Sequence, residues 1–393
     1  MKKIVLAFDS FKGSLTSKEV ADAFEKGLLC VAPDAQIQKV CIADGGEGTM
    51  AALMESLGGE YVDVEVCNPL GRKIIARYAV VDGGKTAVIE MAQASGLTLL
   101  SAEERNPLAT STYGTGQLVA DAIRRGCRKL LVCIGGSATN DGGTGMLTAL
   151  GYRFVDAEGL ELSGCGANLS LIAAIDGSRA MAELKNVEFI VACDVKNPLY
   201  GINGAAYVFA AQKGADEDMI RILDEGLRNY SEALARYCGR DVSQNPGAGA
   251  AGGMGAGMMA ILDARMQAGV EMVLDAVDFD KTIDDAQLIV TGEGKLDRQT
   301  MMGKAPAGVL ARARACNIPV VAVGGGVEWC DELRQAGFAR ILSATPADMP
   351  LAVAMQHDVA INNVKATAST LITSHPYNLH PHNLTTSSNT PIA

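Results

Sequence analysis

The chain has 393 residues, of which 48% are hydrophobic and 20% are charged. This length and composition predict a globular protein of two or three domains with substantial cores. The formal net charge of -11 argues against a nucleic-acid groove or an anionic membrane surface as the main partner.

Targeting segments and two kinds of site are also not expected. No apolar run approaches the length of a bilayer span, and Asp9 interrupts the first apolar run, which favours a first strand over a signal peptide. The ten cysteines show no CxxC spacing, so we expect reduced thiols in a cytoplasmic protein. The first histidine is His357, so neither a Ser-His-Asp triad nor a histidine-ligated zinc is expected in the main fold.

The amino-terminal part of the chain has a strand-helix-strand-helix pattern. Thr16 precedes Glu19 by three residues, which is the spacing of a helix capping box. Such alternation favours a parallel sheet. The predicted elements are a strand at 4–8, a helix after Thr16, a strand at 39–42, its exit turn at 43–49 and a helix at 50–57.

The pattern changes after residue 71. Two apolar runs at 74–81 and 85–91, joined by Asp-Gly-Gly at 82–84, predict an antiparallel hairpin. A second domain is therefore expected to start near residue 67. Within it we expect a helix at 115–125, strands at 130–134 and 187–193, and a helix at about 217–237.

Alternation resumes near residue 286. The predicted elements are a strand at 288–290, a turn at 291–297, a helix from Pro306, a strand at 320–323, a turn at 324–326 and a strand at 341–342. The expected fold class is α/β, with a parallel domain at 1–66 and 285–373 and a mixed α/β domain inserted at 67–284. Residues 374–393 lack periodicity and are expected to be a disordered tail.

Three turns, at 43–49, 134–145 and 291–297, combine glycines with acidic or amide residues after an apolar strand. In a parallel sheet they would lie at the carboxyl edge, where open α/β sheets bind ligands. The turn at 134–145 precedes a predicted helix at 146–150 and would direct backbone N–H groups and a helix dipole at an anion, most often phosphate. The alternative is an ordinary turn that needs glycine for its backbone angles.

Charged residues in these turns suggest what the site binds. The carboxylates Asp44, Glu47, Asp141, Glu293 and Asp297 would concentrate negative charge in one cleft, which suggests a metal or a cationic group, although each could instead cap a helix. Lys12, Lys295 and Lys304 lie beside glycine or serine and suit a phosphate oxygen, although each could be a solvated lysine. Asp194 ends a predicted strand and is a further candidate acid or a turn cap.

Five segments together resemble the bacterial glycerate kinase family, the ATP-dependent kinases of glyoxylate and sugar-acid catabolism. They are DSFKGS at 9–14, ADGGEGT at 43–49, GGSATNDGG at 135–143, VTGEGKLD at 290–297 and GKAP at 303–306. The resemblance extends from residue 1 to about 372. It implies a flavodoxin-like domain formed by both termini, an inserted domain resembling a restriction-endonuclease fold, and an active cleft between them.

The resemblance also implies a reaction, the transfer of the γ-phosphoryl group of ATP to D-glycerate with Mg²⁺, usually giving 2-phosphoglycerate. A homo-oligomer is possible, and the expected partners are otherwise the two small substrates. Two alternatives remain at this stage. One is a phosphatase or mutase with Asp9 or Asp194 as nucleophile, and the other is a non-catalytic sensor of a sugar acid or nucleotide.

Phosphoryl transfer mainly requires positioning and charge neutralisation, and we assign hypothetical roles on that basis. The acid or base and the phosphoryl partners are Asp44, Asp194, Lys12 and Lys295. The nucleotide would contact Gly135, Gly136, Ser137, Thr139, Asn140 and Lys304. The metal would be held by Asp141, Glu293 and Asp297, and glycerate would contact Ser10, Gly45, Gly46, Glu47, Arg72 and Arg298. Which carboxylate is the base and which bind metal stays open.

Overall fold

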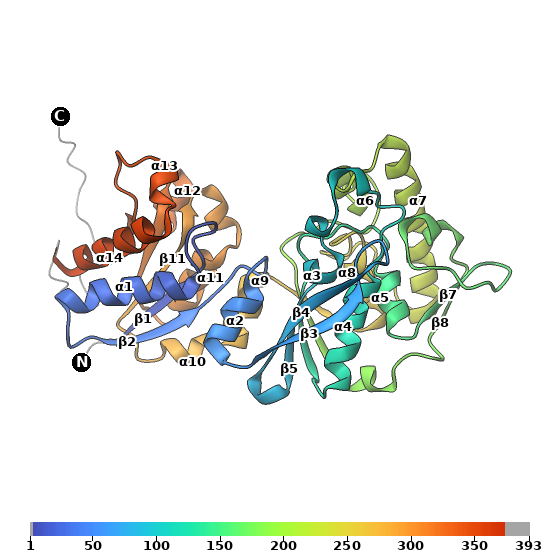
Figure 1. The fold of residues 1–393 in the computed structure, drawn as a ribbon, viewed down its shortest axis with the longest axis horizontal. Helices are drawn as coiled ribbons and strands as arrows, with labels where there is room; N and C mark the ends of the chain where they lie inside the picture. Colours follow the sequence, from blue (N-terminus) through green and yellow to red (C-terminus); the bar gives the residue numbers. More distant parts are fainter. Residues whose placement is uncertain (1–2, 374–393) are drawn as a thin grey trace. The chain divides into compact units, whose positions relative to one another are not determined.

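The computed structural model describes residues 3–373, and Figure 1 shows its α/β fold. One large sheet has five strands and the other has six. The described chain divides into two compact units: unit 1 consists of residues 3–40, 282–298 and 309–373, and unit 2 consists of residues 41–281 and 299–308. The domain boundaries placed at 66/67 and 284/285 stay predictions, and the tail placed at 374–393 lies outside the described residues.

The five-stranded sheet joins strands from both ends of the sequence. In sheet order the strands are β13 (Arg340–Ser343), β12 (Val320–Val327), β11 (Leu288–Leu296), β1 (Lys3–Phe8) and β2 (Gln36–Cys41). The pairs β1 with β11, β11 with β12 and β12 with β13 are parallel. Ile4 lies opposite Leu288 and Phe8 lies opposite Gly292, so β11 is the direct neighbour of the first strand.

The turns predicted at 291–297 and 324–326 were wrong, because residues 291–296 continue the strand β11 and residues 324–326 continue β12, so that only Asp297 lies beyond a strand. An added Cβ at Gly292 would lie 2.0 Å from the carbonyl oxygen of Val323, and one at Gly324 would lie 2.3 Å from that of Gly326. These glycines allow a close approach of backbone to backbone rather than a reversal of the chain. The acidic and basic residues of 291–297 are therefore carried mainly by a strand.

Two long helices, α1 (Ser17–Val31) and α14 (His357–Thr373), lie side by side in Figure 1. Gly27 makes this packing possible, since a Cβ there would lie 2.1 Å from the carbonyl oxygen of Lys365. The predicted capping box of α1 is confirmed: Glu19 N donates to Thr16 Oγ1 at 3.2 Å, and Thr16 N donates to Glu19 Oε2 at 2.8 Å. Besides α14, the α-helices that follow residue 278 within the described residues are α10 (Phe279–Ile283), α11 (Ala305–Ala315), α12 (Asp331–Gln335) and α13 (Leu351–Ala354).

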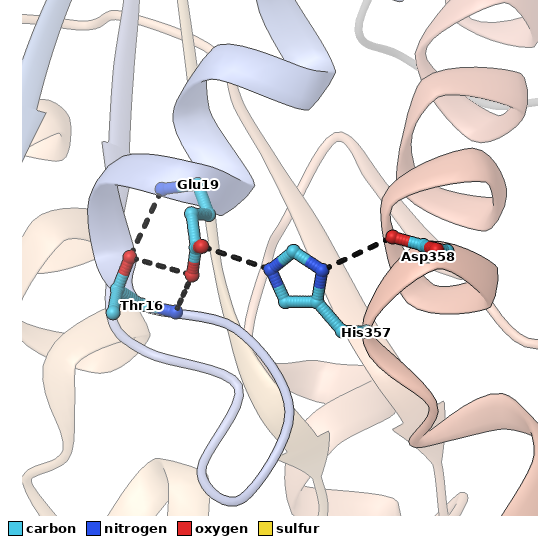
Figure 2. A network of polar contacts seen from close by, with 4 residues as sticks. All are labelled: Thr16, Glu19, His357 and Asp358. Atoms are coloured by element: carbon cyan, nitrogen blue, oxygen red, sulfur yellow. Dashed lines mark hydrogen bonds and ion pairs between the residues drawn. The ribbon is translucent and has the colours of Figure 1, made fainter.

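The capping box also links α1 to the start of α14, as Figure 2 shows. Nε2 of His357 lies 2.9 Å from Glu19 Oε1, and its Nδ1 lies 3.3 Å from Asp358 Oδ1. The hydrogen bonds with Glu19 and Asp358 raise the pKa of His357, and the bond with His357 lowers the pKa of Glu19. The imidazole therefore joins two helices most strongly when it is protonated.

We expect this contact to make the stability of unit 1 depend on pH. Because the folded-state pKa of His357 lies above the unfolded value of about 6.5, its protonated form contributes fully below about pH 6.5, and the contribution is lost as the pH rises through the folded-state pKa. His357→Gln should therefore lower the melting temperature more at pH 6 than at pH 9. Thermal unfolding of both proteins across this range measures the difference, and an equal loss at both pH values contradicts the prediction.

The six-stranded sheet of unit 2 is mixed. In sheet order its strands are β10 (Arg265–Gln267), β9 (Glu188–Ala192), β6 (Lys129–Cys133), β5 (Thr86–Glu90), β4 (Lys73–Val81) and β3 (Glu60–Cys67). The strands β5, β6, β9 and β10 are parallel, whereas β3, β4 and β5 pair antiparallel. The predicted hairpin is confirmed as β4 and β5, and β3 is a strand to which the sequence analysis assigned no element.

Helices pack against this sheet around a continuous apolar core that includes Tyr78, Ile89 and Tyr230. The predicted helices near 115–125 and 217–237 are confirmed as α4 (Tyr113–Arg124) and α7 (Glu217–Cys238). The others are α2 (Thr49–Leu57), α3 (Ala92–Ser95), α5 (Thr144–Ala149), α6 (Ala205–Phe209), α8 (Met254–Ile261) and α9 (Gly269–Ala276), with a small antiparallel ribbon of β7 (Arg153–Val155) and β8 (Ala174–Asp176). Within residues 3–373, no helix combines the length and apolarity that crossing a membrane requires.

Candidate active site

Three parallel strands of unit 2 end at the same level. Glu90 at the end of β5 is the register partner of Cys133 at the end of β6, and Cys133 is the partner of Ala192 at the end of β9. A loop at 135–141, which we call the glycine loop, follows β6, and Asp194 follows β9. The carboxyl edge of this sheet therefore carries both an anion-binding candidate and carboxylates.

The outer part of the glycine loop presents backbone donors. Gly135 and Gly136 are exposed, Ser137 is half-buried, and Gly136 has a φ of 73°, which favours glycine. Leu97 N donates to the carbonyl oxygen of Gly136 at 2.9 Å. Within residues 3–373, the N–H groups of Gly135, Gly136 and Ser137 donate to no backbone carbonyl. Neighbouring N–H groups in such a turn form a concave site that suits an anion.

Asp141 is used inside the loop. It is fully buried: its Oδ2 accepts hydrogen bonds from Thr112 N at 2.8 Å, Thr112 Oγ1 at 2.7 Å and Gly145 N at 3.2 Å, and its Oδ1 accepts one from Gly143 N at 3.1 Å. Burial raises the pKa of this carboxyl, and these hydrogen bonds oppose the rise. Asp141 therefore fixes the end of the loop, and its role as a metal ligand stays a prediction.

The helix predicted at 146–150 is confirmed as the short α5 at 144–149. At its start, the N–H groups of Gly143 and Gly145 already donate to Asp141, and Met146 N donates to Thr112 Oγ1 at 2.8 Å. Because side chains occupy these donors, the start of α5 is closed to an external anion. The donors that face solvent belong to residues 135–137.

The inner part of the loop is buried. Thr139 and Asn140 are fully buried, and within the described residues their side-chain polar atoms have no hydrogen-bond partner. Lys304, which is also predicted to contact nucleotide, is half-buried directly before α11, and its carbonyl oxygen accepts from Ala307 N at 3.1 Å. The exposed surface of the loop is thus formed by its backbone.

Asp44 and Asp194 converge at the start of α9. Asp194 Oδ1 accepts a hydrogen bond from Gly269 N at 3.0 Å, and a Cβ at Gly269 would lie 2.1 Å from the carbonyl oxygen of Asp44. Partial burial raises the pKa of Asp194, the Gly269 N–H opposes this, and the charge of Asp44 adds to it. A carboxylate with a raised pKa beside a second carboxylate is suited to accept a proton.

The turn that carries Asp44 is held in place by glycine contacts. Gly45 is buried with a φ of 83°, and a Cβ there would lie 2.4 Å from Gly269 Cα. Gly46 N donates to Asp44 Oδ1 at 3.1 Å, whereas Glu47 is exposed. The predicted substrate residues of this turn therefore lie next to Asp44 in a fixed backbone.

Glu90 is a member of the acidic group that sequence reasoning missed. It is 6% exposed, and its Oε1 accepts a hydrogen bond from Met50 N at 2.9 Å near the start of α2. Burial raises its pKa, hydrogen bonds from Met50 and Gly48 oppose this, and the charge of Glu47 adds to it. A lone acidic residue at the end of the apolar run of β5 was the available signal.

The candidate residues of unit 1 gather around β1 and β11. Asp9 is 4% exposed, its Oδ1 accepts from Ser10 N at 2.6 Å, and its own N–H donates to the carbonyl oxygen of Gly292 at 2.9 Å. Glu293 on β11 is 6% exposed, and a Cβ at Gly294 would lie 3.3 Å from the backbone nitrogen of Lys12. The structure therefore brings the segments 9–12 and 292–294 together.

The remaining cations of the prediction lie in surface ion pairs. Nζ of Lys295 is 2.5 Å from Glu328 Oε2 and 3.7 Å from Asp297 Oδ2, and these contacts raise its pKa. Arg72 pairs with Glu104 at 2.7 Å, and Arg298 pairs with Glu332 at 2.9 Å. Binding of a substrate carboxylate by either arginine would compete with an existing partner.

No preformed metal cage is present in residues 3–373, where no three His, Cys, Asp or Glu side chains come together to hold an ion. A magnesium ion that accompanies phosphates needs only one or two protein carboxylates, because phosphate and water oxygens complete its shell. Glu293 and Asp297 supply oxygen ligands of the required kind.

Comparison with known proteins shows to which family this chain belongs. A model of the glycerate kinase family matches residues 4–375. The chain belongs to the glycerate kinase family. It is 45% identical over 370 residues to a glycerate kinase of Bacillus cereus, which covers 94% of this chain and 97% of that protein. It is 46% identical over 325 residues to a glycerate 2-kinase of Escherichia coli, covering 83% of this chain and 85% of the relative.

A solved structure agrees with this membership. A crystal structure assigned as a glycerate kinase 2 of Salmonella typhimurium LT2 superposes with a TM-score of 0.88 and 42% identity, covering 95% of this chain and 98% of that one. The glycerate kinase family member described here is therefore an enzyme of the kinase class with an α/β fold of parallel and mixed sheets.

Proposed function

We propose that this chain transfers the γ-phosphoryl group of ATP to D-glycerate and forms 2-phosphoglycerate. The observation that supports the proposal most is the joint position of the glycine loop and the carboxylates Asp44 and Asp194 at the carboxyl edge of one sheet. A kinase needs an anion-binding backbone and a proton acceptor close together. The E. coli relative named glycerate 2-kinase supports the choice of product.

In this proposal the phosphates of ATP bind the N–H groups of Gly135, Gly136 and Ser137, with Thr139 and Asn140 forming the layer beneath them. Lys12 and Lys295 neutralise charge on the transferred group, and Lys304 contacts the nucleotide. Asp44 or Asp194 orients the glycerate hydroxyl and removes its proton. Glycerate contacts Ser10, Gly45, Gly46 and Glu47, and its carboxylate is bound by Arg72 or Arg298 after exchange of an ion-pair partner.

Magnesium, when bound, would neutralise phosphate oxygens and help to align the γ-phosphoryl group. We propose that Glu293 and Asp297 hold it, because each offers carboxylate oxygens near the end of β11. Asp141 is the less suited ligand of the predicted three, since its two oxygens already accept four hydrogen bonds. Exchange of those bonds for a metal would loosen the glycine loop.

The finer description of the fold is also a proposal. The parallel sheet that combines β1 and β11 supports a flavodoxin-like domain, and the mixed sheet of unit 2 supports a resemblance to restriction endonucleases. That catalysis takes place in a cleft between two domains, that the enzyme is cytoplasmic and that it forms a homo-oligomer stay predictions.

Phosphorus NMR of the reaction products tests the proposal. Incubation with ATP, Mg²⁺ and D-glycerate should convert ATP to ADP and produce the resonance of 2-phosphoglycerate, and no conversion should occur without glycerate. Formation of 3-phosphoglycerate contradicts the proposed regiochemistry. Phosphate release without ATP indicates a phosphatase, and thermal stabilisation by glycerate without turnover indicates a sensor.

A further inference from the structure

Lys213 is a buried cation to which the sequence analysis gave no role. It ends the short 3-10 turn at Ala211–Lys213 and is 2% exposed. Lysine is almost never buried to this degree without a partner, because removing an ammonium group from water is costly. Its Nζ donates to the carbonyl oxygen of Thr139 at 2.6 Å, so the partner is the backbone of the glycine loop.

The backbone around Lys213 is rigid. Lys213 N donates to the carbonyl oxygen of Ala210 at 2.9 Å, and Gly214 follows with a φ of 93°. A Cβ at Gly214 would lie 2.3 Å from the carbonyl oxygen of Arg105, so this turn is packed against a neighbouring segment. The ammonium group is therefore delivered to the loop from a fixed base.

Lys213 belongs to a set of donors that bind the carbonyl oxygens of the glycine loop. Leu97 N holds the carbonyl of Gly136, and Thr110 Oγ1 holds that of Ala138 at 2.9 Å. Lys213 holds the next carbonyl, that of Thr139. In a trans peptide unit the C=O and the following N–H point in opposite directions. Fixing these carbonyls therefore sets the direction of the N–H groups of Ser137, Thr139 and Asn140.

We infer that Lys213 is a positioning residue of the phosphate site: its ammonium group anchors the Thr139 carbonyl, fixes the inner end of the loop that carries the exposed N–H groups, and adds a positive charge beneath the bound anion. The ligand class is a nucleotide polyphosphate, and the inference rests on the proposed function. Lys213 itself does not touch the substrate, because the loop backbone lies between them. Its effect passes through that backbone and through its charge.

The charge of Lys213 should change within a measurable pH range. Burial lowers its pKa to about 8, and the charge of Asp141 opposes the shift. Asp141 is the titratable group that acts on it, and Tyr230, whose pKa burial raises well above its usual range, stays neutral beside Asp141. The positive charge is thus present at pH 7 and is lost as the pH rises above about 8, which should weaken ATP binding.

The test compares Lys213→Met, Lys213→Arg and the matched control Lys185→Met, which removes an exposed lysine of unit 2. Lys213→Met should raise the KM for ATP about tenfold with a smaller effect on kcat, and remove the pH dependence of that KM above pH 8. Lys213→Arg keeps its charge at all these pH values, so its KM should stay constant from pH 7 to 9.5. Lys185→Met should behave as the wild type.

Hydrogen exchange of the ligand-free proteins provides a readout that needs no turnover. Peptides that cover residues 135–141 should exchange faster in Lys213→Met than in the wild type, and peptides from β3 and β4 should not. Unchanged exchange together with an unchanged KM for ATP overturns the inference. If Lys213→Met does not fold, a wild-type KM that fails to rise above pH 8, or a parallel rise in Lys213→Arg, overturns it. If the wild-type enzyme does not phosphorylate glycerate, the proposed function fails, and the same variants are compared by the dissociation constant of ATP in place of KM. The inference about Lys213 is then tested separately from the proposed function.

Discussion

Asp44→Asn should lower kcat by about 10²- to 10⁴-fold with a much smaller change in the KM for ATP. An amide cannot accept the proton of the glycerate hydroxyl, so the variant loses base catalysis. It can still accept the hydrogen bond that Gly46 N gives to Asp44 Oδ1 at 3.1 Å, and the turn should keep its shape. Steady-state kinetics with ATP, Mg²⁺ and D-glycerate, together with thermal unfolding, measures the effect.

Two further variants make this result specific. Asp34→Asn changes an exposed aspartate in the turn after α1 and should leave kcat unaltered. Asp194→Asn retains the acceptor for Gly269 N and tests the second candidate base. A folded Asp44→Asn enzyme with near wild-type kcat removes Asp44 as the base. If Asp194→Asn then shows the large loss, the base is Asp194.

Gly252→Ala should be among the most destabilising single substitutions in unit 2. The added Cβ would lie 2.2 Å from the carbonyl oxygen of Thr139 and 2.5 Å from Asn140 Cα, and the residue has a φ of 67°. Neither contact is a flexible side-chain end, so the glycine loop must move. We expect a loss of about 3 kcal/mol or more, a clear fall in melting temperature and a raised KM for ATP.

Gly239→Ala is the matched control. Gly239 caps α7 with a φ of 71°, but a Cβ there would meet open space. Its cost should be limited to the left-handed backbone angle, about 1 kcal/mol, with no effect on KM. The melting temperatures of the two variants are compared, and their KM values are measured well below the unfolding transition. The comparison separates the cost of the left-handed backbone angle from the clash of the added Cβ with the glycine loop. Equal destabilisation by both substitutions would mean that the loop does not constrain Gly252.

Local patterns in the sequence predicted much of the fold. The spacing of Thr16 and Glu19 predicted the start of α1, and the apolar runs around Asp82 predicted the hairpin of β4 and β5. Both depend on interactions between residues close in sequence, which is why they could be read directly. The strand β3 alternates charged and apolar residues, with Val62 and Val66 buried, and this signal was passed over.

The residues that the sequence analysis misjudged or passed over have surroundings that are set by distant parts of the chain. Gly292 occurs in a strand because the carbonyl of Val323 approaches it, and no local pattern distinguishes this from a turn glycine. The metal-binding role of Asp141 stays a prediction, but its hydrogen bond with Thr112, 29 residues earlier, could not be read from a local pattern. Lys213 carries no local signal of a role, and only the fold shows that its ammonium group binds a carbonyl of the glycine loop.

The order in which the strands are synthesised leaves one edge of the five-stranded sheet's first strand unpaired for most of translation. The first strand, β1, is apolar and buried along five of its six residues, yet its neighbour β11 begins only at Leu288. During translation β1 therefore leaves the ribosome long before one of its two edges can be paired. An unpaired apolar strand edge can pair with other chains, so the nascent protein is exposed to aggregation at β1 until β11 emerges.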